Sequence, residues 1–181
     1  MPMDLEAEFS GLPLSETAYY LRLGLQLEVV TLADVSDWVD AVLLREEEPN
    51  GFFVELYRLL RLRQPDVLAY LAAAFPPARF TARPALAWLQ QRLAGSSWPL
   101  GRVSRALYRL RTLVESEVEV GWIYGLAADY ERAASGPAEA LQEVYRETEA
   151  FLACYHDYTF ANRPEWLYLD AVLPQRWAGL R

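Results

Sequence analysis

The apolar residues of this chain recur at helical spacing between short breaks, and this pattern constrains the fold more than any other feature of the sequence. The stretch 31–75 shows it best, because it holds three consecutive amphipathic segments separated by breaks that carry proline, asparagine and glycine. In the first segment one helix face carries Val35, Trp38, Val39 and Val42. The pattern predicts a compact helical unit against which later helices pack.

The other segments repeat this pattern, and together they predict an all-α, single-domain bundle of about seven to nine helices over residues 1–181. Thr31 and Asp34 resemble a capping pair that opens the helix after residue 30. Helix and strand compete only in segment 17–30, whose apolar residues also alternate with period two. We favour helix there, since an isolated strand would leave its edges unpaired.

The two ends of the chain differ in character. Residues 1–14 contain Gly11 and Pro13 and predict an N-terminal arm or loop. Residues 162–181 are too apolar for a free tail, so we expect this C-terminal segment to fold back onto the bundle. Its apolar residues are Trp166, Tyr168, Leu169, Leu173 and Trp177.

Composition places the chain among globular proteins that need no covalent support. Its 181 residues are 53% hydrophobic, and its single cysteine, Cys154, permits no internal disulfide. No apolar run approaches the roughly 20 residues of a membrane-spanning helix. The N-terminus is acidic where a secretory signal would be basic and then apolar. These features predict a protein of the bacterial cytoplasm with no membrane association.

Charge is segregated along the chain. Residues 1–60 hold twelve acids and three arginines, residues 61–114 hold one acid and nine arginines, and residues 115–181 hold twelve acids and five arginines. The net charge of −8 argues against a nucleic-acid binder, which would have to neutralise phosphates. Two interpretations stay open: helices of opposite sign pair within the fold, or one or both signs form a patch for a charged partner.

Two candidate binding surfaces follow from this segregation. The acidic candidate lies on the helix that Thr31 opens, with the run 46–48 expected to close that helix before Pro49. It comprises Asp34, Asp37, Asp40, Glu46, Glu47 and Glu48. The basic candidate lies on the clearest amphipathic helix, from about residue 99 to 116, opposite its apolar stripe. It comprises Arg102, Arg105 and Arg109.

The inventory of catalytic groups is thin. His156 is the only histidine, and it lies two residues from Cys154, a spacing that points the two side chains to different faces of a helix. Beside Asp157 near a helix end, His156 is typical of a residue that caps the helix. Glycines such as Gly95 and Gly121 stand singly, so no phosphate-binding loop is indicated. We therefore predict no catalytic residue, metal site or cofactor.

Two stretches carry a resemblance to a group of proteins. Residues 23–60 resemble the opening of small helical bacterial proteins in which a capped, acidic helix bearing a tryptophan is followed by a proline-linked apolar helix. Residues 122–155 resemble their closing pair of helices. Some of these proteins resemble the immunity proteins that accompany polymorphic bacterial toxins. The resemblance implies a helical fold and a toxin as partner, and it assigns no functional residue.

Three functions therefore compete. The first is a non-enzymatic protein-binding protein that neutralises a cognate toxin through the acidic surface. The second is a maturation chaperone or adaptor that holds a peptide in a groove between helices. The third is an enzyme that uses carboxylates and a metal ion. A homo-oligomer formed through the tryptophan-rich C-terminal segment also stays open.

Overall fold

The computed structural model describes residues 3–180, and every regular element in this range is a helix. The predicted all-α class is confirmed. The described residues form ten α-helices and one 3₁₀ helix, against the seven to nine expected, partly because a one-turn helix lies in the expected N-terminal arm. Residues 1 and 2 of that arm, and residue 181 of the C-terminal segment, lie outside the described residues.

Contacts between Cα atoms divide the chain into two compact units, residues 1–80 and residues 81–181. We call them unit 1 and unit 2. Each holds five α-helices within the described residues, and unit 2 also holds the 3₁₀ helix. A single domain over residues 1–181 stays a prediction.

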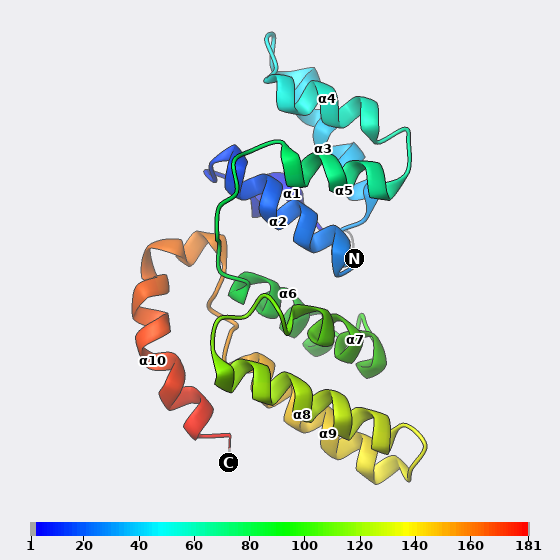
Figure 1. Cartoon of the computed structure of the whole chain (residues 1–181), viewed down its shortest axis with the longest axis vertical. Coiled ribbons are helices and arrows are strands. Elements are labelled where there is room, and N and C mark those ends of the chain that lie inside the picture. Colours follow the sequence, from blue (N-terminus) through cyan, green and yellow to red (C-terminus); the bar gives the residue numbers. More distant parts are fainter. Residues whose placement is uncertain (1–2, 181) are drawn as a thin grey trace. The chain divides into compact units, whose positions relative to one another are not determined.

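In unit 1, helix α3 contacts α1 and α4, and helix α5 contacts α4 and α2 (Figure 1). These contacts enclose a core to which every helix contributes, and which includes Leu5, Leu21, Val39, Leu56 and Val67. The helices of unit 1 are α1 (Leu5–Glu8), α2 (Leu14–Gln26), α3 (Leu32–Arg45), α4 (Gly51–Leu59) and α5 (Gln64–Ala73).

Helix α2 decides the ambiguous segment 17–30 in favour of helix, as predicted, although the helix ends at Gln26. Glu28 then adopts a left-handed backbone conformation with φ of 62°. This turn lets the amides of Val29 and Val30 donate to the carbonyl of Gly24 at 3.0 and 3.1 Å. Such bonds satisfy carbonyls at a helix end, and here they redirect the chain toward α3.

Helix α3 begins with the capping pair that the sequence predicts. The Thr31 amide donates to Asp34 Oδ2 at 2.8 Å, and the Asp34 amide donates to Thr31 Oγ1 at 3.2 Å. The predicted apolar face, Val35, Trp38, Val39 and Val42, is buried. The helix ends at Arg45, so residues 46–48 lie in the connection to α4 and not in the helix itself. Three acids at a helix C-terminus would oppose the helix dipole, which favours this earlier end.

The N-terminal segment packs onto unit 1 where a loose arm was expected. Asp4 caps the single turn of α1 by accepting from the Ala7 amide at 3.1 Å. Leu5 and Phe9 are buried, and the Phe9 ring lies edge-on to Trp38 with ring centroids 6.0 Å apart. Apolar residues at positions 5 and 9 share a helix face, and their burial anchors the segment.

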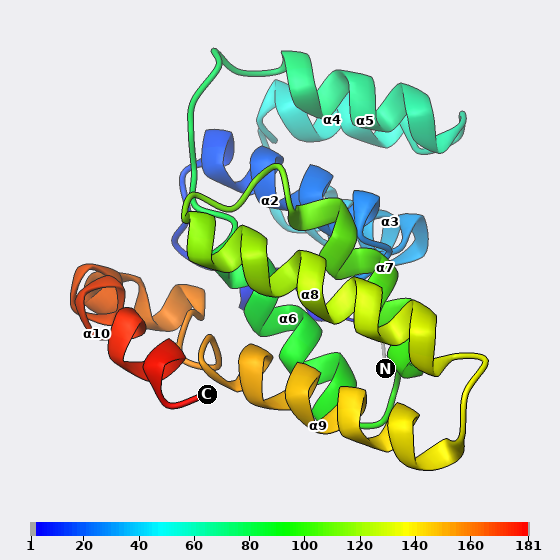
Figure 2. The ribbon, with the colours of Figure 1, turned by 60° about the horizontal axis from the view of Figure 1, so that its bottom comes forward.

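In unit 2, α6 contacts α7, α7 contacts α8, α8 contacts α9, and α9 contacts α6. These four helices therefore form a closed bundle, and α8 and α9 lie side by side in both Figure 1 and Figure 2. The elements of unit 2 are α6 (Arg83–Ala94), α7 (Leu100–Leu110), α8 (Glu117–Ala133), α9 (Ala138–Ala153), η1 (Phe160–Glu165) and α10 (Trp166–Ala178).

The boundary between α7 and α8 differs from the expectation. The helix expected over about 99–116 ends at Leu110, because Ser116 caps the next helix. Ser116 Oγ accepts from the Val118 amide at 3.2 Å, and the Ser116 amide donates to Glu119 Oε2 at 3.1 Å. Helix α8 thus starts at Glu117.

The C-terminal segment folds back, as predicted. Leu169, Leu173 and Trp177 of α10 are buried. Arg176 of the same helix donates from Nη1 to the carbonyl of Cys154 at 2.7 Å and from Nη2 to Asp157 Oδ2 at 2.8 Å. Residues 162–180 are therefore an integral part of unit 2.

Candidate functional site

The structure separates the six acids of the predicted acidic surface into two groups. Asp34 is half-buried and caps α3, and Glu46 pairs with Arg45 at 3.5 Å. The other four acids make no ion pair with any residue of the range 3–180. We call these four the α3 acidic edge, and they are Asp37, Asp40, Glu47 and Glu48.

The three arginines of the predicted basic face also differ in what they do. The Arg102 guanidinium lies over Trp98, with its Cζ atom 3.9 Å from the ring centroid, and the side chain is half-buried. Arg105 and Arg109 are exposed on α7. Arg102 is therefore held by a cation–π contact within unit 2, and the exposed basic charge of this trio is that of Arg105 and Arg109.

Cys154 and His156 lie in different surroundings, as their spacing predicts. The Cys154 thiol is buried, and this burial raises its pKa, which makes it a poor nucleophile. His156 is exposed. Its Nδ1 lies 2.7 Å from the carbonyl of Ala153 at the end of α9, and its Nε2 lies 3.0 Å from Asp157 Oδ1. This is the helix-end role that the sequence indicates.

A buried polar cluster in unit 2 was not predicted from the sequence. Arg83, the first residue of α6, donates from Nε to Glu119 Oε1 at 3.1 Å and from Nη2 to Glu119 Oε2 at 3.4 Å. The Glu119 side chain is 0% exposed and the Arg83 side chain 12%. A charge pair this deep is costly to form and very costly to break on one side only.

Further hydrogen bonds extend this pair to α10. The Tyr155 hydroxyl donates to Glu119 Oε1 at 3.1 Å and accepts from Trp177 Nε1 at 3.1 Å. Arg83 Nη1 also donates to Asp170, which accepts from the Tyr158 hydroxyl at 2.8 Å. The cluster therefore ties the starts of α6 and α8 to α10 and to the turn after α9.

The electrostatics of the cluster favour fixed protonation states. Burial alone would lower the pKa of Arg83, but the hydrogen bonds and the charge of Glu119 outweigh it and raise that pKa. Burial, together with the Glu119 charge, raises the pKa of Tyr155. Burial and the hydrogen bond to Asp170 raise the pKa of Tyr158. A guanidinium that stays charged and two phenols that stay neutral keep these hydrogen bonds in place, so the cluster stabilises the fold of unit 2.

No set of three or more histidine, cysteine, aspartate or glutamate side chains within residues 3–180 is arranged to hold a metal ion. In the cluster, both oxygens of Glu119 already accept hydrogen bonds from Arg83, Tyr155 and the Ser116 amide. The motif Ser116-x-x-Glu119 is a capping-box signal that the sequence offered. The sequence gives no signal that Arg83, which lies 36 residues away, pairs with Glu119.

A groove runs along the outer side of unit 2 between α8 and α9. Two adjoining hollows, which share Asp129 and Glu147, make up what we call the α8–α9 groove. Its apolar lining includes Val118, Gly121, Trp122, Gly125, Leu126 and Val144. Its charged lining is Glu117, Asp129, Glu143 and Glu147 together with Arg132.

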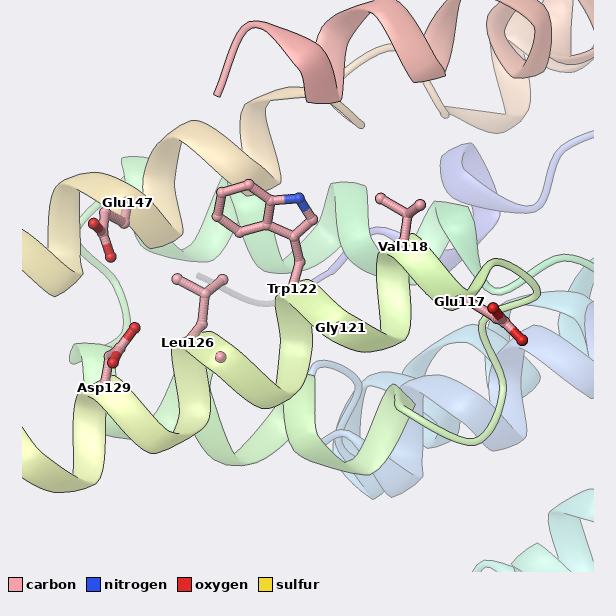
Figure 3. A pocket seen from close by; sticks show the side chains of 8 residues that line it. Glu117, Val118, Gly121, Trp122, Leu126, Asp129 and Glu147 are labelled. Carbon is pink, nitrogen blue, oxygen red and sulfur yellow. The ribbon is translucent and has the colours of Figure 1, made fainter. Parts of the chain in front are cut away.

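Figure 3 shows how these side chains are placed. Asp129 from α8 and Glu147 from α9 both lie at one end of the view, beyond Leu126, whereas Glu117 lies at the opposite end. Between them Trp122 stacks on Phe151 of α9, with ring centroids 5.8 Å apart and an angle of 23° between the rings. The hollow that Figure 3 shows is therefore apolar along its middle and acidic at both ends.

No helix in residues 3–180 is both long and apolar enough to cross a membrane. Comparison with protein-family models, with curated proteins and with solved structures finds no match for this chain.

Proposed function

We propose that this chain is a non-enzymatic protein that binds a basic protein partner through the α3 acidic edge. The observation that carries the proposal is the set of carboxylates on this edge, which make no ion pair with any residue of the range 3–180. The one arginine in segment 31–51, Arg45, already pairs with Glu6 at 2.7 Å and with Glu46.

Because these carboxylates make no ion pair within residues 3–180, a partner would supply the opposite charge. Asp37 and Asp40 are three residues apart on α3, and neighbouring like charges on a helix cost a few tenths of a kcal/mol. Basic side chains brought by a partner would relieve that repulsion. A concentrated negative field also steers a positive partner and raises the rate of association, an effect that salt screens.

A basic antibacterial toxin is the first partner class to test. Such a partner agrees with the resemblance of segments 23–60 and 122–155 to helical proteins that include immunity proteins. Under this proposal the chain acts in the cytoplasm and neutralises the toxin by binding it.

The test uses the protein encoded beside this chain as the probe. We expect it to co-purify with the full chain at low salt. A variant with lysine at Asp37, Asp40, Glu47 and Glu48 should lose about 100-fold or more in affinity, with loss of growth protection. The matched control places lysine at four exposed acids elsewhere, Glu115, Glu131, Glu139 and Glu165. Equal loss in both variants, or full binding by the first, would refute the assignment.

A further inference from the structure

We propose that the α8–α9 groove docks an amphipathic helix of another protein, one with small and aliphatic residues on its contact face and lysine or arginine at its ends. This site lies in unit 2, whereas the α3 acidic edge lies in unit 1, so the two proposals stand or fall separately. A groove that binds a helix in this way would let the chain act as an adaptor for a helical peptide segment.

Two glycines in α8 give the first argument. Gly121 and Gly125 are exposed, and a Cβ atom added to either would meet no atom within 4 Å. A glycine inside a helix costs roughly 0.5–1 kcal/mol relative to alanine. Nothing within the described chain requires that cost, because the space above both residues is open.

Gly101 of α7 shows the opposite case. A Cβ atom there would collide with the side chain of Tyr130 on α8, whose Cζ atom would lie 2.8 Å away. Gly101 is therefore explained by close packing within unit 2. Gly121 and Gly125 have no such explanation, and their spacing of four residues puts them on one face, where a second helix could approach closely.

The charged lining gives the second argument and fixes the chemistry of the occupant. Asp129 pairs with Arg132, but Glu117, Glu143 and Glu147 make no ion pair with any residue of the range 3–180. Three carboxylates without an ion-pair partner in this range therefore border an apolar surface that includes Trp122 and Val118. An occupant that covers this surface needs apolar residues in the middle and basic residues at its ends.

A second copy of this chain that packs through its own α8 does not meet that requirement. Gly121 and Gly125 are centred on position 123, and Glu117 and Asp129 lie equally far from that centre. An antiparallel pair of α8 helices would place the Glu117 end of one copy against the Asp129 end of the other. A parallel pair would place each acid against its own equivalent. Glu117 would face another carboxylate in either pairing, which disfavours an α8 pair and favours a basic helix of another protein as the occupant.

The length of the groove suits a short helix. Along α8 the hollow that Figure 3 shows extends from Glu117 to Asp129, and the rise of a helix between these positions is about 18 Å. A partner helix of about three to four turns matches this length. Straight grooves between packed helices accept such helices through residues spaced three and four apart.

The test selects peptides from a phage-displayed library of helical segments about four turns long, with the full chain as bait. We expect enrichment of peptides with alanine, serine or leucine on one face and lysine or arginine at both ends. Binding of a synthetic selected peptide to the full chain should weaken as salt rises. Selection of neutral or acidic peptides, or no enrichment over an empty support, would overturn the proposal.

Two pairs of variants then locate the binding site. Gly125→Leu fills the groove and should weaken peptide binding by about tenfold or more, whereas Ala153→Leu, at an exposed position of α9 outside the groove, should leave it within about twofold. The double change Glu143→Gln and Glu147→Gln should weaken binding by about two- to fivefold per charge, whereas Glu131→Gln and Glu139→Gln should have no such effect.

These variants also separate this proposal from the proposed function. Lysine at the four positions of the α3 acidic edge should leave peptide binding in the groove unchanged. Circular dichroism of each variant confirms that it is folded. Full binding by both the filled and the neutralised groove, or equal losses in the control variants, would overturn the proposal.

Discussion

Two faces of helix α8 use the same kind of residue for opposite purposes. On the inner face Glu119 is 0% exposed and accepts hydrogen bonds from Arg83, Tyr155 and the Ser116 amide. On the outer face Glu117 is exposed and makes no ion pair within residues 3–180. The inner carboxylate holds the bundle together, whereas the outer one remains available to another molecule.

The same contrast holds for the small residues of the bundle. The Tyr130 side chain of α8 occupies the space beside Gly101 on α7, while Gly121 and Gly125 face open space. A residue that costs stability is explained on the inner side by its neighbours. On the outer side no neighbour within the described residues explains it, and the proposed partner helix would. This difference, more than the number of acids, indicates where unit 2 would bind.

The largest expected effect tests the inner face. Glu119→Gln should lower the free energy of unfolding by about 3 kcal/mol, because it leaves the buried Arg83 guanidinium without its main counter-charge. Urea denaturation followed by circular dichroism measures this change. Glu117→Gln is the matched control and should stay within about 0.5 kcal/mol of the wild type. Similar small changes in both variants would remove the distinction between the two faces.

A smaller effect should come from Tyr155. Tyr155→Phe leaves the Trp177 indole N–H without its acceptor, which should cost about 1–3 kcal/mol near neutral pH. The folded chain raises the pKa of Tyr155 above the value of about 10 found in unfolded chains. The tyrosine therefore contributes full stability below pH about 10, and this contribution falls by about 1.4 kcal/mol per pH unit as the pH rises above that value.

Denaturant titrations at a series of pH values between neutral and strongly alkaline check this pH dependence. Tyr155→Phe should flatten the alkaline loss of stability by the share of one tyrosine, and Tyr158 should account for part of what remains, because its pKa is raised as well. An unchanged alkaline slope in the variant would show that the Tyr155 hydroxyl is not held protonated by the fold.

The sequence predicted those parts of the fold that depend on local signals. The Thr31 cap, the buried face of α3 and the return of the C-terminal segment all follow from residues close together in the chain. Local signals failed at α8, where a second capping box at Ser116 shortened the preceding helix. The motif is present, but the apolar spacing of the preceding helix continues through Val114, which lies beyond the end of α7.

The site was harder to predict because it depends on long-range pairs. Arg83 and Glu119 are 36 residues apart, and each belongs to a charged residue type that usually lies on the protein surface. Gly121 stands singly in the sequence, and only the helix that contains both glycines puts it on one face with Gly125. Charge counting identified acids, yet only side-chain geometry shows that Asp34 and Glu46 have partners within unit 1.

The most direct measurement compares the stability of glycine variants in the two settings. The double variant Gly121→Ala and Gly125→Ala should raise the free energy of unfolding by about 1–2 kcal/mol, because each alanine restricts the unfolded chain and meets no atom in the fold. Gly101→Ala should lower it, because the Tyr130 ring must move. A double variant less stable than the wild type would contradict the claim that the outer face of α8 is left open for a partner.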